Sequence, residues 1–106
     1  MTATDRLSLL QYEYLGLDDV AVPEFKIALK ELRDLALEDR YEHHAALHLG
    51  DIADAENCQQ LKEARNWGLG FLQGLACAKG LSQSQIDGLG RVFQLAAERS
   101  AARIAG

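Results

Sequence analysis

The stretch WGLGFLQGLACAKGLSQSQI, from Trp67 to Ile86, contains the end of one helix, a tight corner and the start of a second helix. Apolar residues recur at spacings of three and four before the corner, which indicates one face of a helix. Gly80 is typical of a residue that ends a helix, and Ser82 with Gln85 three positions later forms a capping-box pattern. The stretch therefore predicts two helices that meet at a short connection.

The first of these helices is expected from about residue 54 to Lys79, with two different faces. The core face carries Leu61, Ala64, Gly68, Phe71, Leu72 and Leu75. The opposite face is almost free of side chains and carries Asn66, Gly70, Gly74 and Cys77. A glycine inside a helix costs about 1 kcal/mol relative to alanine, so something must compensate for several of them. Close approach of another backbone is a physical reason for small residues spaced by four.

The helix after the corner is expected to run to the end of the chain. Its core positions are Ile86, Leu89, Gly90, Phe93, Ala97, Ser100 and Ile104. Before the corner region, a short helix over about residues 5 to 15 is predicted, with Thr4 as its cap and Gly16 as its stop. A connector over 17–22 follows.

A long helix is then predicted from Pro23 to about Leu49, because apolar residues continue at helical spacing. These are Phe25, Ala28, Leu29, Leu32, Leu35, Ala36, Ala46 and Leu47. Asp39 and His43 interrupt this stripe four positions apart, so we expect them to face the core as a hydrogen-bonded pair inside or at the edge of the bundle. The opposite face is expected to expose an acidic strip of Glu31, Asp34 and Glu38. Gly50 is predicted to end the helix, with Asp51 or Asp54 as the next cap.

The fold class predicted from these elements is all-α, in a single domain over residues 1–106. One proline and few runs of β-branched residues argue against strands. A chain of 106 residues can bury a modest core without disulfides or a metal. We expect a small bundle of one short and three longer helices, in which the last two form a tight antiparallel hairpin.

The charge distribution and the cysteines bear on partners and compartment. Residues 1–53 carry eleven acids and five bases, whereas 54–106 carry five and six, which together give the net charge of −5. An acidic chain favours basic partners over nucleic acid. Cys58 and Cys77 are expected in one helix about 28 Å apart, too far to form a disulfide. Unpaired thiols, no secretory signal and no long apolar run predict a cytoplasmic protein with no membrane span.

The sequence contains no motif that indicates catalysis or a cofactor. It has no glycine-rich phosphate loop, no nucleophile elbow and no Cys–His pair at a known spacing, so we expect a protein that is not an enzyme and binds no cofactor. His44, His48 and Asp51 have the spacing of metal ligands on a helix, but the expected stop at Gly50 argues against a three-ligand site. Metal binding through His44 and His48 is kept as a second alternative.

The corner also suggests a DNA-binding alternative. The residues Leu75, Ala76, Gly80, Leu81, Ser82, Ile86 and Leu89 resemble the helix-turn-helix unit of phage-type repressors. That resemblance implies a small regulator that reads DNA through Gln83, Ser84 and Gln85. Few basic residues lie near the corner to contact phosphates, chiefly Lys79 and Arg91.

The main functional prediction is a non-enzymatic protein–protein interaction module. The chain would act as a homodimer, or as an adaptor or small inhibitor of a larger cytoplasmic partner, as many small accessory proteins of bacteria do. The predicted interface combines the small-residue face of the 54–79 helix, with Trp67 beside it, and the acidic strip. Tryptophan is enriched at the energetic centre of interfaces, and small residues allow a partner to come close.

Overall fold

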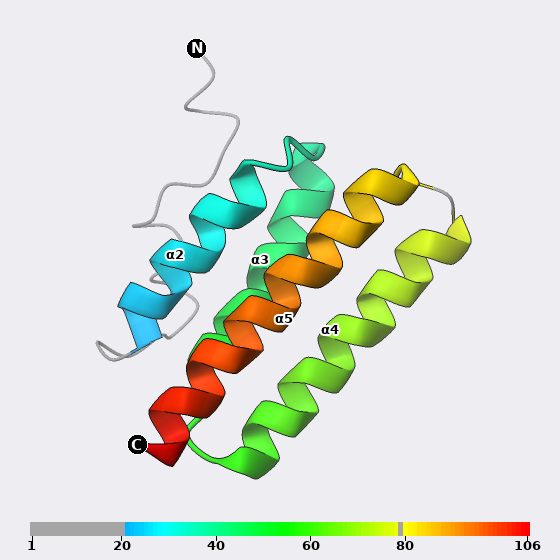
Figure 1. Cartoon of the computed structure of the whole chain (residues 1–106). Helices are drawn as coiled ribbons and strands as arrows, with labels where there is room; N and C mark the ends of the chain where they lie inside the picture. Colours follow the sequence, from blue (N-terminus) through cyan, green and yellow to red (C-terminus); the bar gives the residue numbers. More distant parts are fainter. Residues whose placement is uncertain (1–20, 79) are drawn as a thin grey trace.

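The computed structural model describes residues 21–78 and 80–106, which form four helices and no strand (Figure 1). The helices are α2 (Ala21–Arg33), α3 (Asp39–Ala53), α4 (Cys58–Ala78) and α5 (Gln83–Ala105). The helix predicted over 5 to 15, with Thr4 and Gly16 at its ends, lies outside the described residues.

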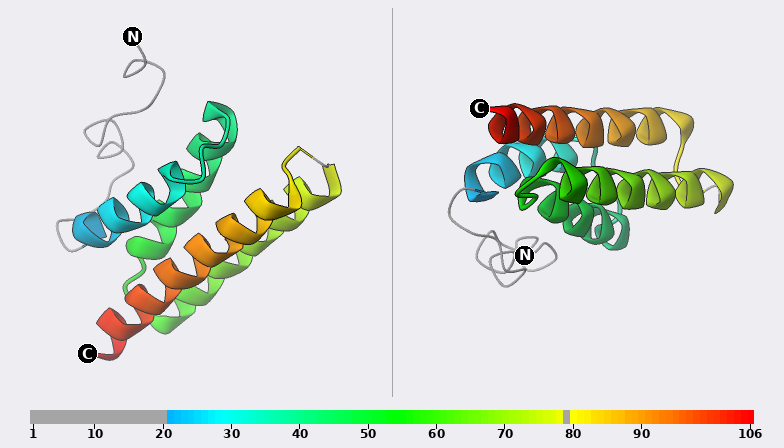
Figure 2. Two further views of the ribbon diagram at one scale, coloured as in Figure 1. Left: turned by 45° about the horizontal axis from the view of Figure 1, so that its top comes forward. Right: turned by 90° about the horizontal axis from the view of Figure 1, so that it is seen from below.

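The four helices pack as an antiparallel bundle. Each helix contacts the next one along the chain, α2 also packs against α5, and α3 meets α5 across the centre. The two views of Figure 2 show α4 and α5 side by side and running in opposite directions. The all-α bundle with a tight hairpin of its last two helices is therefore confirmed.

The corner between α4 and α5 has the predicted capping box. The Ser82 hydroxyl accepts a hydrogen bond from the Gln85 backbone N–H at 3.2 Å, and the Gln85 side-chain oxygen accepts one from the Ser82 N–H at 3.0 Å. Two N–H groups at the start of α5 are thereby satisfied.

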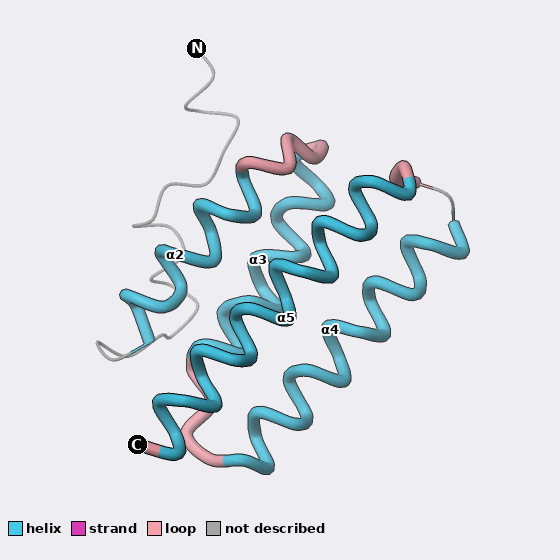
Figure 3. Tube along the Cα trace, viewed as in Figure 1, coloured by secondary structure: helices cyan, strands magenta, loops and turns pink. Residues whose placement is uncertain are grey.

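The predicted long helix from Pro23 to Leu49 is wrong, because it is broken into α2 and α3 by a connection over 34–38, drawn as a loop in Figure 3. The last turn tightens, with hydrogen bonds from Leu35 N to Leu32 O at 3.1 Å and from Ala36 N to Arg33 O at 3.0 Å. Ala36 then adopts a left-handed conformation with φ of 54°. The residue that usually marks such a stop is glycine, so an alanine there gives no signal in the sequence.

Replacing Ala36 with glycine is expected to stabilise the fold by about 0.5 kcal/mol. A left-handed conformation costs an L-residue roughly 1–2 kcal/mol, and the extra freedom of glycine in the unfolded chain cancels part of that gain. Urea unfolding measures the difference, with Ala36→Val as the control, since a β-branched residue should be less stable there. A glycine variant less stable than the parent would contradict this reading of the junction.

Because of the break, the polar residues of this region are not placed as predicted. Asp39 and His43 are both exposed, so the core-facing pair is wrong; Asp39 instead begins α3, where a carboxylate suits the positive end of the helix dipole. Asp34 and Glu38 are exposed beyond the end of α2, whereas the Glu31 carboxylate lies 2.8 Å from the Arg99 guanidinium. The acidic strip is therefore not one helix face.

The connection between α3 and α4 also differs from the prediction. Helix α3 continues through the buried Gly50 to Ala53, and Asp54 is its C-cap. The first turn of α4 is capped by Asn57, whose side-chain oxygen accepts a hydrogen bond from the Gln60 N–H at 2.9 Å. The predicted stop at Gly50 and the predicted caps Asp51 and Asp54 are therefore wrong. Asparagine is about as good a cap as aspartate, so the residue types do not favour the two aspartates over Asn57.

Candidate functional site

Helix α4 turns one face into the bundle and leaves the other open. The predicted core positions Leu61, Ala64, Gly68 and Leu75 are buried, and Phe71 and Leu72 are partly buried. A Cβ added at Gly68 would lie 3.5 Å from the Phe93 ring and 3.9 Å from His48 Cβ. Gly68 is therefore the glycine of this helix that faces both α3 and α5 at contact distance.

The predicted interface residues of α4 are on the open side. All of them are exposed, namely Asn66, Trp67, Gly70, Gly74 and Cys77. A Cβ added at Gly70 or at Gly74 would meet nothing within 4 Å. Packing within the described part of the chain therefore does not account for these two glycines. We call these five residues the α4 face.

Trp67 is the most exposed large apolar side chain of the described residues. It is 69% exposed, compared with 49% for Ile27 and 45% for Leu69. The segment from Asn66 to Ala78 also contains no acidic or basic side chain, although a quarter of the whole chain is charged. Depletion of charge with an exposed aromatic residue is the composition of an interface core. The composition of the sequence indicates this uncharged segment, whereas the spacing of its glycines does not.

A groove of about 350 Å³ lies between α3 and α4 beside Trp67. It is lined by Asp51, Asp54, Ala55, Gln60, Glu63, Ala64 and Trp67. Three of these side chains are carboxylates and none is basic. The sequence did not predict this acidic groove, because its carboxylates come from two helices and the helix carrying Asp51 was expected to end earlier.

The metal-ligand candidates lie on α3 but do not form a three-ligand site. The described residues contain no group of three or more histidine, cysteine or acidic side chains that could hold a metal. His48 instead packs against aromatic rings, with centroid distances of 5.0 Å to Phe71 and 6.3 Å to Phe93. The His44 ring is 6.1 Å from Phe71. Both cysteines, Cys58 and Cys77, are free and exposed.

The surroundings of His48 and Asp51 shift their pKa values in opposite directions. Burial lowers the pKa of His48 below 6.5, and the charge of His44 adds to this, while Asp51 partly opposes it. Packing around its carboxyl group raises the pKa of Asp51 above 3.8; His48 lowers it and Asp54 raises it. Each group is therefore held closer to its neutral form than it would be in the unfolded chain.

The lowered pKa of His48 predicts a loss of stability as the pH falls through 6.5. In that window the unfolded chain binds the proton more readily than the folded chain, so protonation favours unfolding. Asp51 has the opposite effect: stability should rise as the pH falls through a lower window, just above 3.8, because there the folded chain binds the proton more readily. We expect urea unfolding at about pH 7.5 and about pH 5.5 to show a smaller pH dependence for His48→Leu than for the parent. An identical pH dependence in the two proteins would exclude His48 as its source.

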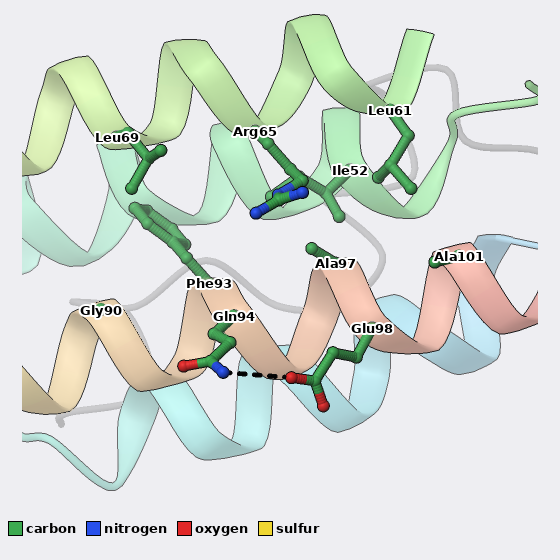
Figure 4. A pocket seen from close by; sticks show the side chains of 10 residues that line it. All are labelled: Ile52, Leu61, Arg65, Leu69, Gly90, Phe93, Gln94, Ala97, Glu98 and Ala101. Carbon is green, nitrogen blue, oxygen red and sulfur yellow. Dashed lines mark hydrogen bonds between the residues drawn. The ribbon is translucent and has the colours of Figure 1, made fainter. Parts of the chain in front are cut away.

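A second groove, of about 380 Å³, lies between α4 and α5 (Figure 4). Its apolar lining is Ile52, Leu61, Leu69, Gly90, Phe93, Ala97 and Ala101, and its polar lining is Arg65, Gln94 and Glu98. Gln94 donates a hydrogen bond to Glu98 at 3.1 Å. Leu69 borders this groove and Trp67 borders the acidic one, so α4 has a hollow on each side.

The residues of the DNA-binding alternative are placed poorly for reading bases. Gln83 donates to the Asp87 carboxylate at 2.8 Å, and the Gln85 side chain is used in the capping box. Ser84 lines a groove together with the acids Glu31, Asp34 and Asp87, beside a single base, Arg91. Helix-turn-helix units also cross at a steep angle, whereas α4 and α5 run antiparallel side by side (Figure 2). The arrangement gives this alternative no support.

Comparison with known proteins adds no relative: no protein-family model matches the chain, and no curated protein or solved structure matches it significantly. In the described part of the chain, no helix is both long and apolar enough to cross a lipid bilayer.

Proposed function

We propose that this chain is a non-enzymatic protein-binding module of the cytoplasm that uses the α4 face, either to form a homodimer or to bind a larger protein as an adaptor or inhibitor. The observation that carries the proposal is the 69% exposure of Trp67 next to two helix glycines with open space above them. Two free, exposed thiols fit a reducing compartment.

Burial of this face would supply part of the free energy that a specific contact needs. A tryptophan presents about 150–250 Å² of surface, and burial contributes about 25 cal/mol per Å² of apolar area. Covering the exposed part of Trp67 would therefore contribute roughly 3 kcal/mol before the costs of association. Gly70 and Gly74 let a partner backbone approach close to the helix, which adds contacts that larger side chains would block.

Replacing Gly74 with leucine is expected to abolish association while raising the stability of the isolated fold. The stability gain follows because leucine is a better helix former than glycine by roughly 1 kcal/mol, and a Cβ atom at this exposed position would meet nothing within 4 Å. The loss of association follows because the new side chain fills the open space. Opposite signs of the two effects separate a lost interface from a damaged fold.

The measurements are solution mass as a function of concentration, recovery of co-purifying proteins, and thermal unfolding. Ala102→Leu is the matched control, since it adds apolar bulk to an exposed position of α5.

Trp67→Ala should weaken association by about tenfold or more, as truncation of an interface anchor does. Association should also slow thiol labelling of Cys77 more than that of Cys58, which lies at the other end of α4. If Gly74→Leu keeps both its mass and its co-purifying proteins, the proposal is wrong.

A further inference from the structure

We propose that the groove between α3 and α4 receives an arginine or lysine side chain of the protein partner, held between the carboxylates of Asp51, Asp54 and Glu63 and the indole of Trp67. This inference rests on the proposed function, because the groove borders the α4 face and shares Trp67 with it. It names the chemistry of the partner: an apolar segment that carries a cationic side chain.

The size and composition of the groove fit one inserted side chain. Its volume of about 350 Å³ is at the small end of ligand pockets, which span about 300–1,000 Å³. An exposed tryptophan face attracts a guanidinium or ammonium group through cation–π interaction, and tryptophan is the best ring for it. These carboxylates do not form a metal-ion site, but a guanidinium has five N–H donors spread over a planar fork and can donate to carboxylates that one metal ion could not bridge.

The electrostatics of this end of α3 favour a cation that the described chain does not supply. Asp51 lies in the last turn of α3 and Asp54 is its C-cap, at the negative end of the helix dipole, and the last turn has no basic residue. Arg103 donates to the Ala53 carbonyl at 3.0 Å, but its charge is already paired with Glu24 at 2.8 Å. A cation in the groove would relieve this accumulation of negative charge.

The pKa of Asp51 agrees with this picture. Burial raises the pKa of its carboxyl group, His48 partly opposes this, and the nearby charge of Asp54 raises the pKa further. Glu63 already accepts a hydrogen bond from the Gln59 side chain at 3.0 Å through one of its oxygens. An apolar segment without a cation would desolvate Asp51 and Asp54 without supplying an opposite charge, which is costly. A second copy of this chain is a poorer occupant than a basic partner, because each copy carries a net charge of −5.

The test uses the single tryptophan of the chain, Trp67, as a fluorescent reporter. The probe is a synthetic amphipathic peptide of leucine and arginine, and its matched copy has every arginine replaced by citrulline, which is similar in shape but uncharged. We expect the arginine peptide to shift Trp67 emission saturably and to bind about tenfold or more tightly than the citrulline peptide. Binding of the arginine peptide should weaken as salt is added.

The variants Glu63→Gln and Asp54→Asn locate the effect in the groove. Each is expected to weaken binding of the arginine peptide by several-fold and the pair by about tenfold, with little change for the citrulline peptide. The matched control is Glu98→Gln, which removes one exposed carboxylate from α5 on the other side of α4. Because glutamine and asparagine keep the size of the side chains, all three proteins should fold.

Four outcomes overturn the inference. Equal binding of the two peptides would show that binding does not depend on the charge of the arginine side chains. Equal effects of the groove variants and Glu98→Gln would show only a long-range attraction between the acidic protein and the basic peptide. A shift of Trp67 emission with protein concentration, together with no binding of the arginine peptide, would assign this surface to a second copy. If Gly74→Leu loses its partner but the arginine peptide does not bind, the inference fails and the proposed function stands. If the peptide binds as expected but Gly74→Leu keeps its partner, the groove binds cations while the proposed function fails.

Discussion

Replacing Arg103 with alanine is expected to lower the free energy of unfolding by about 2–4 kcal/mol, because this side chain joins three helices at one end of the bundle. Its Nε donates to the Glu24 carboxylate at 2.8 Å, and its Nη2 donates to the carbonyl oxygens of Ala53 at 3.0 Å and Ala55 at 2.8 Å. The side chains of Arg103 and Glu24 are only 24% and 19% exposed. Their removal from water is therefore largely compensated by these bonds.

The alanine variant would leave several polar groups without a partner. Among the described residues, Glu24 would retain only the Ser100 hydroxyl, at 2.9 Å. The carbonyl oxygens of Ala53, at the end of α3, and of Ala55, just beyond it, would lose the guanidinium. A buried acceptor left unpaired costs about 1–3 kcal/mol, which is more than the net gain from a typical hydrogen bond.

Arg99→Ala is the matched control for this prediction. Arg99 also joins α5 to α2, but through one ion pair with Glu31 at 2.8 Å, in which the two side chains are 26% and 30% exposed. Among the described residues Arg99 makes no bond to a backbone carbonyl, and Arg99 Nη1 and Glu31 Oε1 are buried without a hydrogen-bond partner. Losing this less well satisfied pair is therefore expected to cost less, about 1 kcal/mol. Urea unfolding of both variants gives the comparison, and equal losses would show that the contacts of Arg103 to the end of α3 contribute nothing.

The parts of the fold that the sequence predicted well depend on local patterns. The stripe that contains Phe25, Leu29 and Leu32 is buried, and the capping box of Ser82 and Gln85 forms as expected. Both signals lie within a few residues of the structure they predict, so no knowledge of the packing was needed.

The features that the sequence did not predict depend on special backbone geometry or on distant contacts. The break after α2 occurs at Ala36, a residue type that does not signal a left-handed stop. The cluster of Glu24, Ser100 and Arg103 joins residues that are 76 and 79 positions apart. Helical periodicity identifies which face is buried, but it does not identify the polar groups that meet there.

The candidate site likewise has a part that was predictable from the sequence and a part that was not. The exposure of Trp67, Gly70 and Gly74 follows from their position on α4 opposite its core stripe, and this was predictable from periodicity. The acidic groove was not predictable, because Asp51 aligns with α4 only if α3 continues through Gly50. A glycine inside a helix is tolerated when the surroundings bury it, and Gly50 is buried.

Replacing Phe93 with alanine is expected to lower the free energy of unfolding by about 3 kcal/mol or more. Phe93 is 5% exposed and forms part of the floor of the groove between α4 and α5. Its ring faces Phe71 at 6.5 Å and His48 at 6.3 Å, and it also lies over Gly68. Truncation would open a cavity at the point where α3, α4 and α5 meet. Water entering this cavity from the groove should keep the loss of stability near the lower end of the range for Phe→Ala substitutions at buried positions.

Trp67→Ala is the contrasting variant, and its stability should stay within about 0.5 kcal/mol of the parent, because Trp67 is 69% exposed. The two truncations remove aromatic rings from neighbouring parts of the molecule, yet one should affect folding and the other association. Urea unfolding and solution mass, measured on both variants, check this division. A loss of stability in Trp67→Ala comparable to that of Phe93→Ala would mean that the indole supports the fold of the single chain. The exposure of Trp67 would then no longer be evidence that the α4 face binds a partner.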